Sequence, residues 1–545
     1  MMLMRSVSNL IVTLAGLFMT HMLFAERLQS PELSVKEPSF AQMSAASVTW
    51  KPVQNATGYE VLLDGQPVEV IGNTLYLSGK TGKHSVIVKA LAEGFEESLP
   101  SETSITVRDY GDGTAASPYL IYTKEDWELF ATALTRNLFS NNGFKGEYVA
   151  LGANIDFQGS KISPVGKNYS TAFQGTFDGR GRMLRNAVIE GGQSIGLFVS
   201  LRGVVKNLKV DGMNIKATAK GPSEGKVAVI SGGEITGQMF NCIVMNSNVE
   251  VNGENAGAYA AAVASVLKSP EALMDRCIAM NNKIRVGNTY AAAIVSRVTS
   301  GAVRNCIAQN NEIYAAGKFA AGITGLICSS EAVVDHCSSI SNKITAGAFY
   351  AAGVAGEITA GVAVNCISEN NIVTVEQRRC AGGVAGLIRK DGNLVNCISK
   401  GCELNLKKAN EPYSGLIFAL AEKDLTGTIS NCLAVSGTVN VLPSATGYIG
   451  IVGGSLAVTY SCSDCYYNEE LTTKYNQTQS GRFYGCGLSG SAGSNYDCIF
   501  PVKKSAMESM SSDSILNRLN AGASRMSAYG ASEWMRGADG YPTIK

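Results

Sequence analysis

Short apolar segments separated by Gly, Asn and Ser fill the chain from about residue 190 to residue 465. Their apolar positions do not follow the period of about 3.6 residues that marks an amphipathic helix, which excludes a helical repeat here. Instead, the tripeptide Asn-Cys-Ile or a close variant returns every 29 to 35 residues. The cysteines of these units are Cys242, Cys277, Cys306, Cys337, Cys366, Cys397 and Cys432, with Cys462 in a weaker copy.

A repeat of about 30 residues built from such pieces matches one coil of a β-helix, with two or three short strands and the turns between them. Stacked coils pair each strand with its copy in the next coil, about 4.8 Å away. Crossovers between parallel strands are right-handed in nearly all proteins. The pattern therefore predicts a right-handed parallel β-helix in which like side chains form ladders.

The cysteine ladder leaves three interpretations open: small buried hydrophobic side chains, scattered disulfides, or a reactive or metal-binding row of thiols. Strict alternation would place Cys on the face of a charged residue two positions earlier, such as Asp275 or Asp335. A turn or bulge at the residue before Cys would return the thiol to the inside. That residue is often Asn, which tolerates left-handed backbone: Asn241, Asn305, Asn365, Asn396 and Asn431.

An aromatic residue followed by small residues closes most units. Tyr350 shares parity with Val354, and Phe319 with Ile323, which favours rings stacked inside the protein if the strand is straight. A row of rings facing solvent would instead offer a platform for sugar rings. Both alternatives stay open, and the candidate binding residues are Tyr259, Tyr290, Phe319, Tyr350, Tyr413 and Tyr448, with Cys380 replacing the ring once.

Residues 45–107 alternate apolar and polar side chains in segments such as 59–63 and 84–90, with glycines between them. Short strands with turn signals at this spacing predict a small β-sandwich with Trp50 as its large buried side chain. The stretches SVTWKPVQNATGYEVLLDG and GKHSVIVKALAEGFEESLPS resemble a fibronectin type III domain. The resemblance implies a spacer or binding module over residues 26–109.

Residues 1–25 have the pattern of a secretory signal peptide, with Arg5 before a short apolar run and Ala25 as a small residue for cleavage. The alternative is an uncleaved N-terminal anchor. No later stretch offers about 18 uninterrupted apolar residues for a membrane span. We therefore expect an exported protein, at the cell surface, secreted or periplasmic, with no transmembrane span.

Helix signals flank the repeats. The segment TKEDWELFATAL, residues 123–134, starts with Thr123 as a possible N-cap and Asp126 near the capping-box position, and residues 513–519 suggest another short helix. Because the open ends of a β-helix would recruit other strands, these segments are expected to cap it. The expected divisions are an N-terminal cap with the first coils (110–190), the repeats (191–465) and a C-terminal cap region (466–545).

The stretches GDGTAASPYLIYTKEDWELFA, FQGTFDGRGR and SIGLFVSLRGVVKNLKV, together with the Asn-Cys-Ile repeats, are similar to GLUG-repeat β-helix proteins. The similarity covers roughly residues 110–545. It implies a surface protein of the kind found in Gram-negative gut bacteria, a family that also occurs beside immunoglobulin A-cleaving metallopeptidases. This chain has no HExxH motif, and the resemblance assigns no site residue.

The composition narrows the possible chemistry. Lys and Arg number 46 and Asp and Glu 45, a net charge of +1, which argues against nucleic acid as a partner. The three histidines, His21, His84 and His336, leave little room for a His-based triad or a His-rich metal site. The gaps between Cys465, Cys486 and Cys498 match no common zinc module, so disulfides or free thiols are expected among the last cysteines.

The predicted fold class is all-β, an N-terminal β-sandwich followed by a right-handed parallel β-helix with short capping helices. The predicted function is non-catalytic binding of a glycan or host surface component through a face of the β-helix, as in an adhesin. The alternatives are a carbohydrate-active enzyme of the lyase or glycosidase type and a purely structural surface rod. No catalytic residue, metal or cofactor is assigned, because fold analogy alone does not supply a function.

Overall fold

The computed structural model divides the chain into two compact units, Met1–Asp112 and Gly113–Lys545. Each unit has its own core. The predicted leader falls almost wholly outside the described residues, which are 25–42, 45–70, 72–136, 142–218, 225–252, 258–377, 379–408, 412–422, 426–441, 448–456, 461–471, 484–486, 499–508 and 514–545.

The first unit contains two small antiparallel sheets, as a β-sandwich requires. Trp50 is buried between them with Val48, Val61 and Val88, and its ring meets the Tyr59 ring edge-on at 5.4 Å. The predicted role of Trp50 as the large core side chain is confirmed. The sheets have the orders β1-β2-β5 and β4-β3-β6-β7, with β1 (Leu33–Lys36), β2 (Ser47–Trp50), β3 (Gly58–Leu63), β4 (Gln66–Pro67), β5 (Thr74–Tyr76), β6 (Gly82–Leu91) and β7 (Ser101–Val107).

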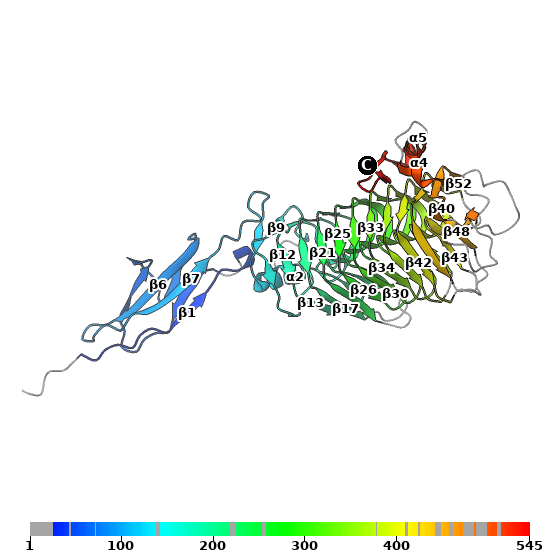
Figure 1. Ribbon diagram of the computed structural model, residues 1–545. Helices are drawn as coiled ribbons and strands as arrows, with labels where there is room; N and C mark the ends of the chain where they lie inside the picture. The colour runs from blue at the N-terminus through cyan, green and yellow to red at the C-terminus, as the bar shows by residue number, and fades with distance from the viewer. Residues whose placement is uncertain are drawn as a thin grey trace, which may run out of the picture. The chain divides into compact units, whose positions relative to one another are not determined.

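The second unit is a parallel β-helix, and strands from successive coils lie side by side along it (Figure 1). One coil consists of β27 (Tyr290–Ala292), β28 (Val295–Arg304), β29 (Ile307–Gln309) and β30 (Glu312–Ala315). The parallel β-helix is confirmed, but each such coil has four strands where two or three were expected. The extra strand arises because the backbone bends after Ala292, between β27 and β28, so the aromatic segment forms a strand of its own.

Four parallel stacks result from this coil. The first contains β14 (Ser194–Ile195), β18 (Gly225–Ala228), β23 (Ala258–Ala261), β27, β31 (Phe319–Ala321), β35 (Tyr350–Ala352), β39 (Cys380–Gly382), β43 (Tyr413–Gly415) and β48 (Tyr448–Leu456). The second contains β8 (Tyr119–Ile121), β9 (Tyr148–Leu151), β11 (Thr176–Asp178), β15 (Val204–Lys206), β19 (Ser231–Ile235), β20 (Gln238–Phe240), β24 (Ala264–Asp275), β28, β32 (Thr324–Asp335), β36 (Ala355–Val364), β40 (Ala385–Val395), β44 (Phe418–Ala421), β45 (Thr428–Ser430), β49 (Ser461–Ser463) and β51 (Tyr484–Cys486). The third contains β10 (Ile155–Asp156), β12 (Met183–Arg185), β16 (Lys209–Asp211), β21 (Ile243–Met245), β25 (Ile278–Met280), β29, β33 (Ser338–Ile340), β37 (Ile367–Glu369), β41 (Ile398–Lys400), β46 (Leu433–Ala434), β50 (Cys465–Asn468) and β52 (Ile499–Val502). The fourth contains β13 (Val188–Gly191), β17 (Asn214–Thr218), β22 (Asn248–Asn252), β26 (Lys283–Val286), β30, β34 (Lys343–Ala346), β38 (Ile372–Val375), β42 (Cys402–Leu406) and β47 (Gly437–Val441).

The residue before each ladder cysteine adopts left-handed backbone. This is the turn that the sequence requires if the cysteine is to point inward rather than outward. Asn305 has φ 53° and His336 has φ 50°, and the cysteine that follows each of them is fully buried. The same holds at Asn241, Arg276, Asn365, Asn396 and Asn431. The predicted turn before Cys is therefore confirmed, and it directs the thiols into the core.

A second left-handed corner lies between the third and fourth strands, at residues such as Asn281 and Asn310. The next residue points inward and forms a buried amide ladder. The main-chain N–H of Asn282 donates to Asn311 Oδ1 at 2.9 Å, and Asn311 repeats this bond to Asn342 at 2.8 Å. These asparagines are at most 2% exposed, so their amides satisfy main-chain groups that water does not reach.

Helix α2 (Lys124–Arg136) packs on the first coils. The Thr123 hydroxyl accepts from the Asp126 N–H, and the Asp126 carboxylate accepts from the Thr123 N–H, both at 3.1 Å. This is the predicted capping box. Trp127 packs edge-on against Phe157 and Phe177 at about 6 Å, so the helix closes the core at this end.

The C-terminal segment contains α4 (Lys504–Glu508), α5 (Ile515–Arg525), β53 (Trp534–Arg536) and β54 (Pro542–Ile544). The helix expected near residues 513–519 is α5, which begins after Ser514 and extends to Arg525. The segment lies alongside the coils (Figure 1), and buried Ile515, Leu519 and Trp534 pack on Leu433 and Val435. It therefore covers the outer side of the later coils.

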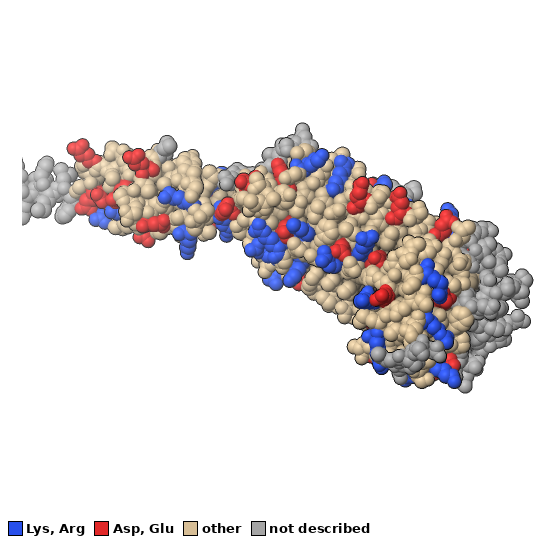
Figure 2. Space-filling model, turned by 90° about the horizontal axis from the view of Figure 1, so that it is seen from above, with Lys and Arg blue, Asp and Glu red and all other residues tan. Residues whose placement is uncertain are grey.

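Lys and Arg lie among Asp and Glu over the face shown in Figure 2, with no large area of one sign. This agrees with the net charge of +1. No helix in the described part of the chain is both long and apolar enough to cross a bilayer.

The buried amide ladder predicts a stability effect. Asn311→Ala removes the acceptor of the Asn282 N–H and the donor to the Ala279 carbonyl. Buried groups without partners cost about 1–3 kcal/mol each, so we expect a loss of about 3 kcal/mol in the free energy of unfolding. Urea unfolding of the full chain measures it, with Gln309→Ala, two residues earlier, as the control. Equal unfolding midpoints for the two variants would show that the ladder does not stabilise the fold.

Candidate functional site

The six aromatic candidates form one column in the first stack, in register with each other and with Cys380. We call Tyr259, Tyr290, Phe319, Tyr350, Tyr413 and Tyr448 the aromatic column. Adjacent rings from Tyr259 to Tyr350 are stacked within 11° of parallel, with centroids 4.9–5.0 Å apart. Tyr413 and Tyr448 stack at 5.3 Å. Because each ring face lies against the next ring, the edges are what the column can present.

Burial differs along the aromatic column. Tyr259, Phe319 and Tyr350 are 4–7% exposed, whereas Tyr290, Tyr413 and Tyr448 are half-buried. Burial raises the pKa of Tyr350 to about 12 and raises that of Tyr290 further, so these hydroxyls stay protonated at neutral pH. They can donate and accept hydrogen bonds where they reach solvent.

Tyr290, Phe319 and Tyr350 each pack over a glycine of the next coil. A Cβ added to Gly325 would lie 3.1 Å from the Tyr290 Cβ, and one added to Gly356 would lie 3.1 Å from the Phe319 Cβ. Gly recurs six residues after Phe319, Tyr350 and Cys380, and this spacing is the sequence signal for the packing.

A second column lies next to the aromatic column, on the second stack. It packs against the rings through Leu387 and Leu420. We call it the facing column, and its residues in register are Glu234, Val266, Arg297, Leu326, Glu357, Leu387 and Leu420.

Charged residues interrupt the facing column. Arg297 donates from Nη1 to the Tyr259 hydroxyl at 2.8 Å, and its Nε lies 3.4 Å from the Cys328 sulfur. An arginine in this apolar column thus contacts the first aromatic ring directly.

Glu357 is 6% exposed, and burial raises the pKa of its carboxyl. Thr359 donates to its Oε1 at 2.9 Å, and Arg389 Nε lies 3.0 Å from the same oxygen, an ion pair without hydrogen-bond alignment. Arg389 Nε is also 3.7 Å from Glu422 Oε2. The aromatic column and the facing column together form one strip, and this strip brings two carboxylates and one guanidinium together beside the rings.

The ladder cysteines are buried thiols without disulfides. Burial raises the pKa of Cys337 and Cys366, so both carry S–H, and each thiol donates to the carbonyl two residues earlier. Their arrangement is that of small core side chains closing a corner. A reactive thiol is typically exposed, whereas the ladder thiols from Cys242 to Cys432 are fully buried.

The ladder ends differently from the prediction. Leu433 pairs with Tyr466, so Cys465 takes the ladder position after Cys432. Cys462 pairs with Ile429 and belongs to another row. Its assignment as the weaker ladder copy was wrong because the left-handed corner of this coil is Asp464, with φ 54°, and the residue after that corner is Cys465. The Cys486 side chain and Cys498 lie outside the described residues.

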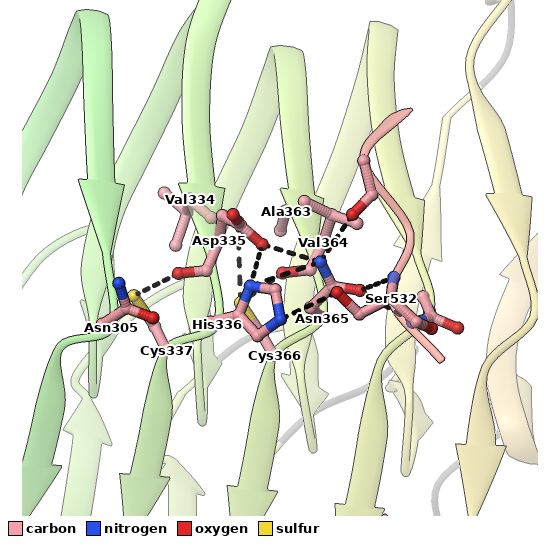
Figure 3. A network of polar contacts seen from close by, with 12 residues as sticks. Asn305, Val334, Asp335, His336, Cys337, Ala363, Val364, Asn365, Cys366 and Ser532 are labelled. Carbon is pink, nitrogen blue, oxygen red and sulfur yellow. Dashed lines mark hydrogen bonds and ion pairs between the residues drawn. The ribbon is translucent and has the colours of Figure 1, made fainter. Parts of the chain in front are cut away.

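A polar network joins the ladder to the C-terminal segment (Figure 3). His336 Nδ1 lies 2.6 Å from Asp335 Oδ1, and His336 Nε2 lies 2.9 Å from the Ser532 hydroxyl. Asn365 donates to Asp335 Oδ1 at 2.7 Å. No sequence pattern predicted this Ser–His–Asp connectivity, because residues 336 and 532 are 196 positions apart.

The main chain of Ser532 is fully engaged. Its N–H donates to Asn365 Oδ1 at 2.8 Å, and its carbonyl accepts from Asn396 Nδ2 at 2.9 Å. Hydrolases with this connectivity use main-chain N–H groups, often that of the nucleophile, to bind the oxyanion. Here that donor is occupied, and the network attaches the C-terminal segment to the residues that precede the ladder cysteines. Trp534 Nε1 donates to Asn396, and Asn431 donates to Leu519 O.

This attachment predicts a pH dependence. The Asp335 hydrogen bond raises the pKa of His336 from about 6.5 despite burial. The stabilisation of the fold by protonated His336 is therefore complete below pH 6.5 and is lost as the pH rises through the raised pKa. Burial acts to raise the pKa of Asp335, but hydrogen bonds from His336 and Asn365 lower it overall. The stabilisation of the fold by the Asp335 carboxylate is therefore lost only in acid. We expect His336→Asn to abolish the decline in melting temperature above pH 6.5.

Melting curves of the full chain between pH 5.5 and 9 test this expectation. His84→Asn, in the first unit, is the control that removes a histidine elsewhere. An unchanged decline in the His336→Asn variant would show that another group causes it.

No protein-family model matches the chain, and no curated protein matches it. Among solved structures, it is similar to a candidate immunoglobulin A1 protease from Bacteroides ovatus, with 18% identity and a TM-score of 0.32 over 80% of this chain and 94% of that one. A second is named IgA1 protease, with 11% identity and a TM-score of 0.30 over 75% of this chain and 30% of that one. A third is a family 28 exopolygalacturonase from Yersinia enterocolitica, with 11% identity and a TM-score of 0.23 over 84% and 99%. Similarity at this level carries no functional argument.

Proposed function

We propose that this protein is exported and binds a glycan or host surface component, without catalysis, along the aromatic column of its β-helix. The leader pattern of residues 1–25 supports export, and the fibronectin type III-like first unit would act as a spacer. In this proposal the repeats are of the GLUG type and the protein belongs to the bacterial cell surface.

The observation that carries the proposal is the combination of ring edges, hydroxyls and ion pairs on one strip. Tyr290, Tyr413 and Tyr448 are half-buried, and Arg389 and Glu422 lie beside the buried rings. Sugars present both apolar C–H groups and hydroxyls, and a site of aromatic carbon with a few placed polar groups suits them.

The two alternatives require other features. A glycosidase needs two carboxylates flanking the scissile bond, and Glu357 and Glu422 are here paired with Arg389, with Glu357 almost fully buried. A purely structural protein would have no reason to place charges at three of the seven positions of the facing column, where the other four carry Val or Leu.

The test is retention of the full chain on arrays of mucin and plant polysaccharides. We expect retention, and we expect the triple variant Tyr290→Phe, Tyr413→Phe and Tyr448→Phe to bind about a hundredfold more weakly, because each of the three lost hydroxyl hydrogen bonds contributes roughly 1 kcal/mol. The column already accepts Phe at position 319, so this variant should fold.

Tyr314→Phe is the matched control, because Tyr314 belongs to β30 in the fourth stack. Retention on no glycan at all would favour the structural alternative. Shortening of a retained polysaccharide would favour the enzyme.

A further inference from the structure

A cavity of about 500 Å³ lies where the aromatic column begins. Ser194 and Lys226 precede Tyr259 in the same register, and both line the cavity. Leu201 bridges Ile235, which places Ser200 opposite Glu234 at the start of the facing column. Small serines and one lysine thus replace the rings of later coils and leave a space in their place. Its volume is within the roughly 300–1,000 Å³ typical of small-molecule sites.

The wall of this cavity holds a fixed ion pair. Glu234 accepts from Lys226 and from Lys268, each at 2.8 Å, and its side chain is 17% exposed. Burial acts to raise the pKa of Glu234, but the two lysines lower it overall, so the carboxylate is ionised at neutral pH. Two ammonium groups share one carboxylate, which leaves positive charge for a ligand.

An exposed aromatic ring also lines the cavity. Tyr169 is 42% exposed, and the Arg202 guanidinium lies 4.0 Å from its centroid. Arg202 Nε is buried and has no hydrogen-bond partner among the described residues. Lys167 also lines the cavity. Two lysines and one carboxylate thus line the cavity, and two further cations, Lys268 and Arg202, contact its lining residues Glu234 and Tyr169.

We propose that this cavity, the Tyr169 cavity, binds a six-membered sugar ring that carries a carboxylate, such as a uronic or sialic acid residue. The sugar occupies the space that an aromatic ring fills in later coils, its ring packs against Tyr169, and its carboxylate pairs with Lys226 or Lys167. The inference rests on the proposed function and names the sugar class that the strip accepts at this end.

Calorimetric titration of the full chain tests the proposal with two matched pairs of probes. Polygalacturonate is compared with its fully methyl-esterified form, and 3′-sialyllactose with lactose. We expect binding of at least one acidic probe and about tenfold or more weaker binding of its neutral partner, the effect of losing one charged hydrogen bond.

Lys226→Tyr is the decisive variant. It extends the aromatic column by one ring, fills the cavity and removes a cation, so the fold should be retained and acidic binding lost. Tyr169→Ala should weaken binding, and Tyr169→Phe should not. Lys343→Gln, on an exposed lysine of the fourth stack, is the control for general charge effects.

The failures of the two proposals are distinguishable. Binding of neither acidic probe, or acidic binding that survives Lys226→Tyr, overturns the Tyr169 cavity as an acidic sugar site. Retention on neutral glycans that is sensitive to the three Tyr→Phe changes would persist in that case, and the proposed function would stand.

Discussion

Main-chain hydrogen bonds between coils fix the register on which every other feature depends. Asn305 N donates to Asp335 O at 3.1 Å, and Ile307 N donates to Cys277 O at 3.0 Å, so the chain on both sides of a corner is bonded to a neighbouring coil. A shift by one residue would move every side chain to the opposite face. The ladders of thiols, amides and rings exist because this register holds over many coils.

The corners of each coil require left-handed backbone, which is energetically unfavourable for most residues. An L-residue other than Asn or Gly loses roughly 1–2 kcal/mol there, yet Arg276 and His336 occupy such corners. Each pairs with the aspartate just before it, at 2.8 Å and 2.6 Å. The ion pair offsets part of the strain. At His336 the departure from Asn also serves tertiary structure, because an imidazole can contact Asp335 and Ser532 with its two nitrogens.

The sequence predicted what depends on local repetition and missed what depends on distant contacts. The stack of coils, the turn before Cys, the capping box at Thr123 and the buried Trp50 followed from spacing and residue type. The position of Cys465 did not, because two cysteines lie three residues apart there and only the left-handed backbone of Asp464 shows which one follows the corner. The hydrogen bond between Ser532 and His336 did not follow from the sequence either, because no spacing rule connects a corner with a segment 196 residues later. The charged residues of the facing column can be read in the sequence, but the side chains that they contact cannot be predicted from it.

In a stacked repeat, departures from a ladder carry the most information about function. The apolar choice at each facing position is set by packing against the rings, so a Val or Leu there needs no further explanation. Burying Glu357 or Glu234 is costly unless it is paired, and both are held by basic side chains. Two such exceptions lie beside the aromatic column, Glu234 in the coil before Tyr259 and Glu357 in the coil of Tyr350. A scaffold that needed only stability would have continued the apolar column through both, and this is why we place binding on this strip.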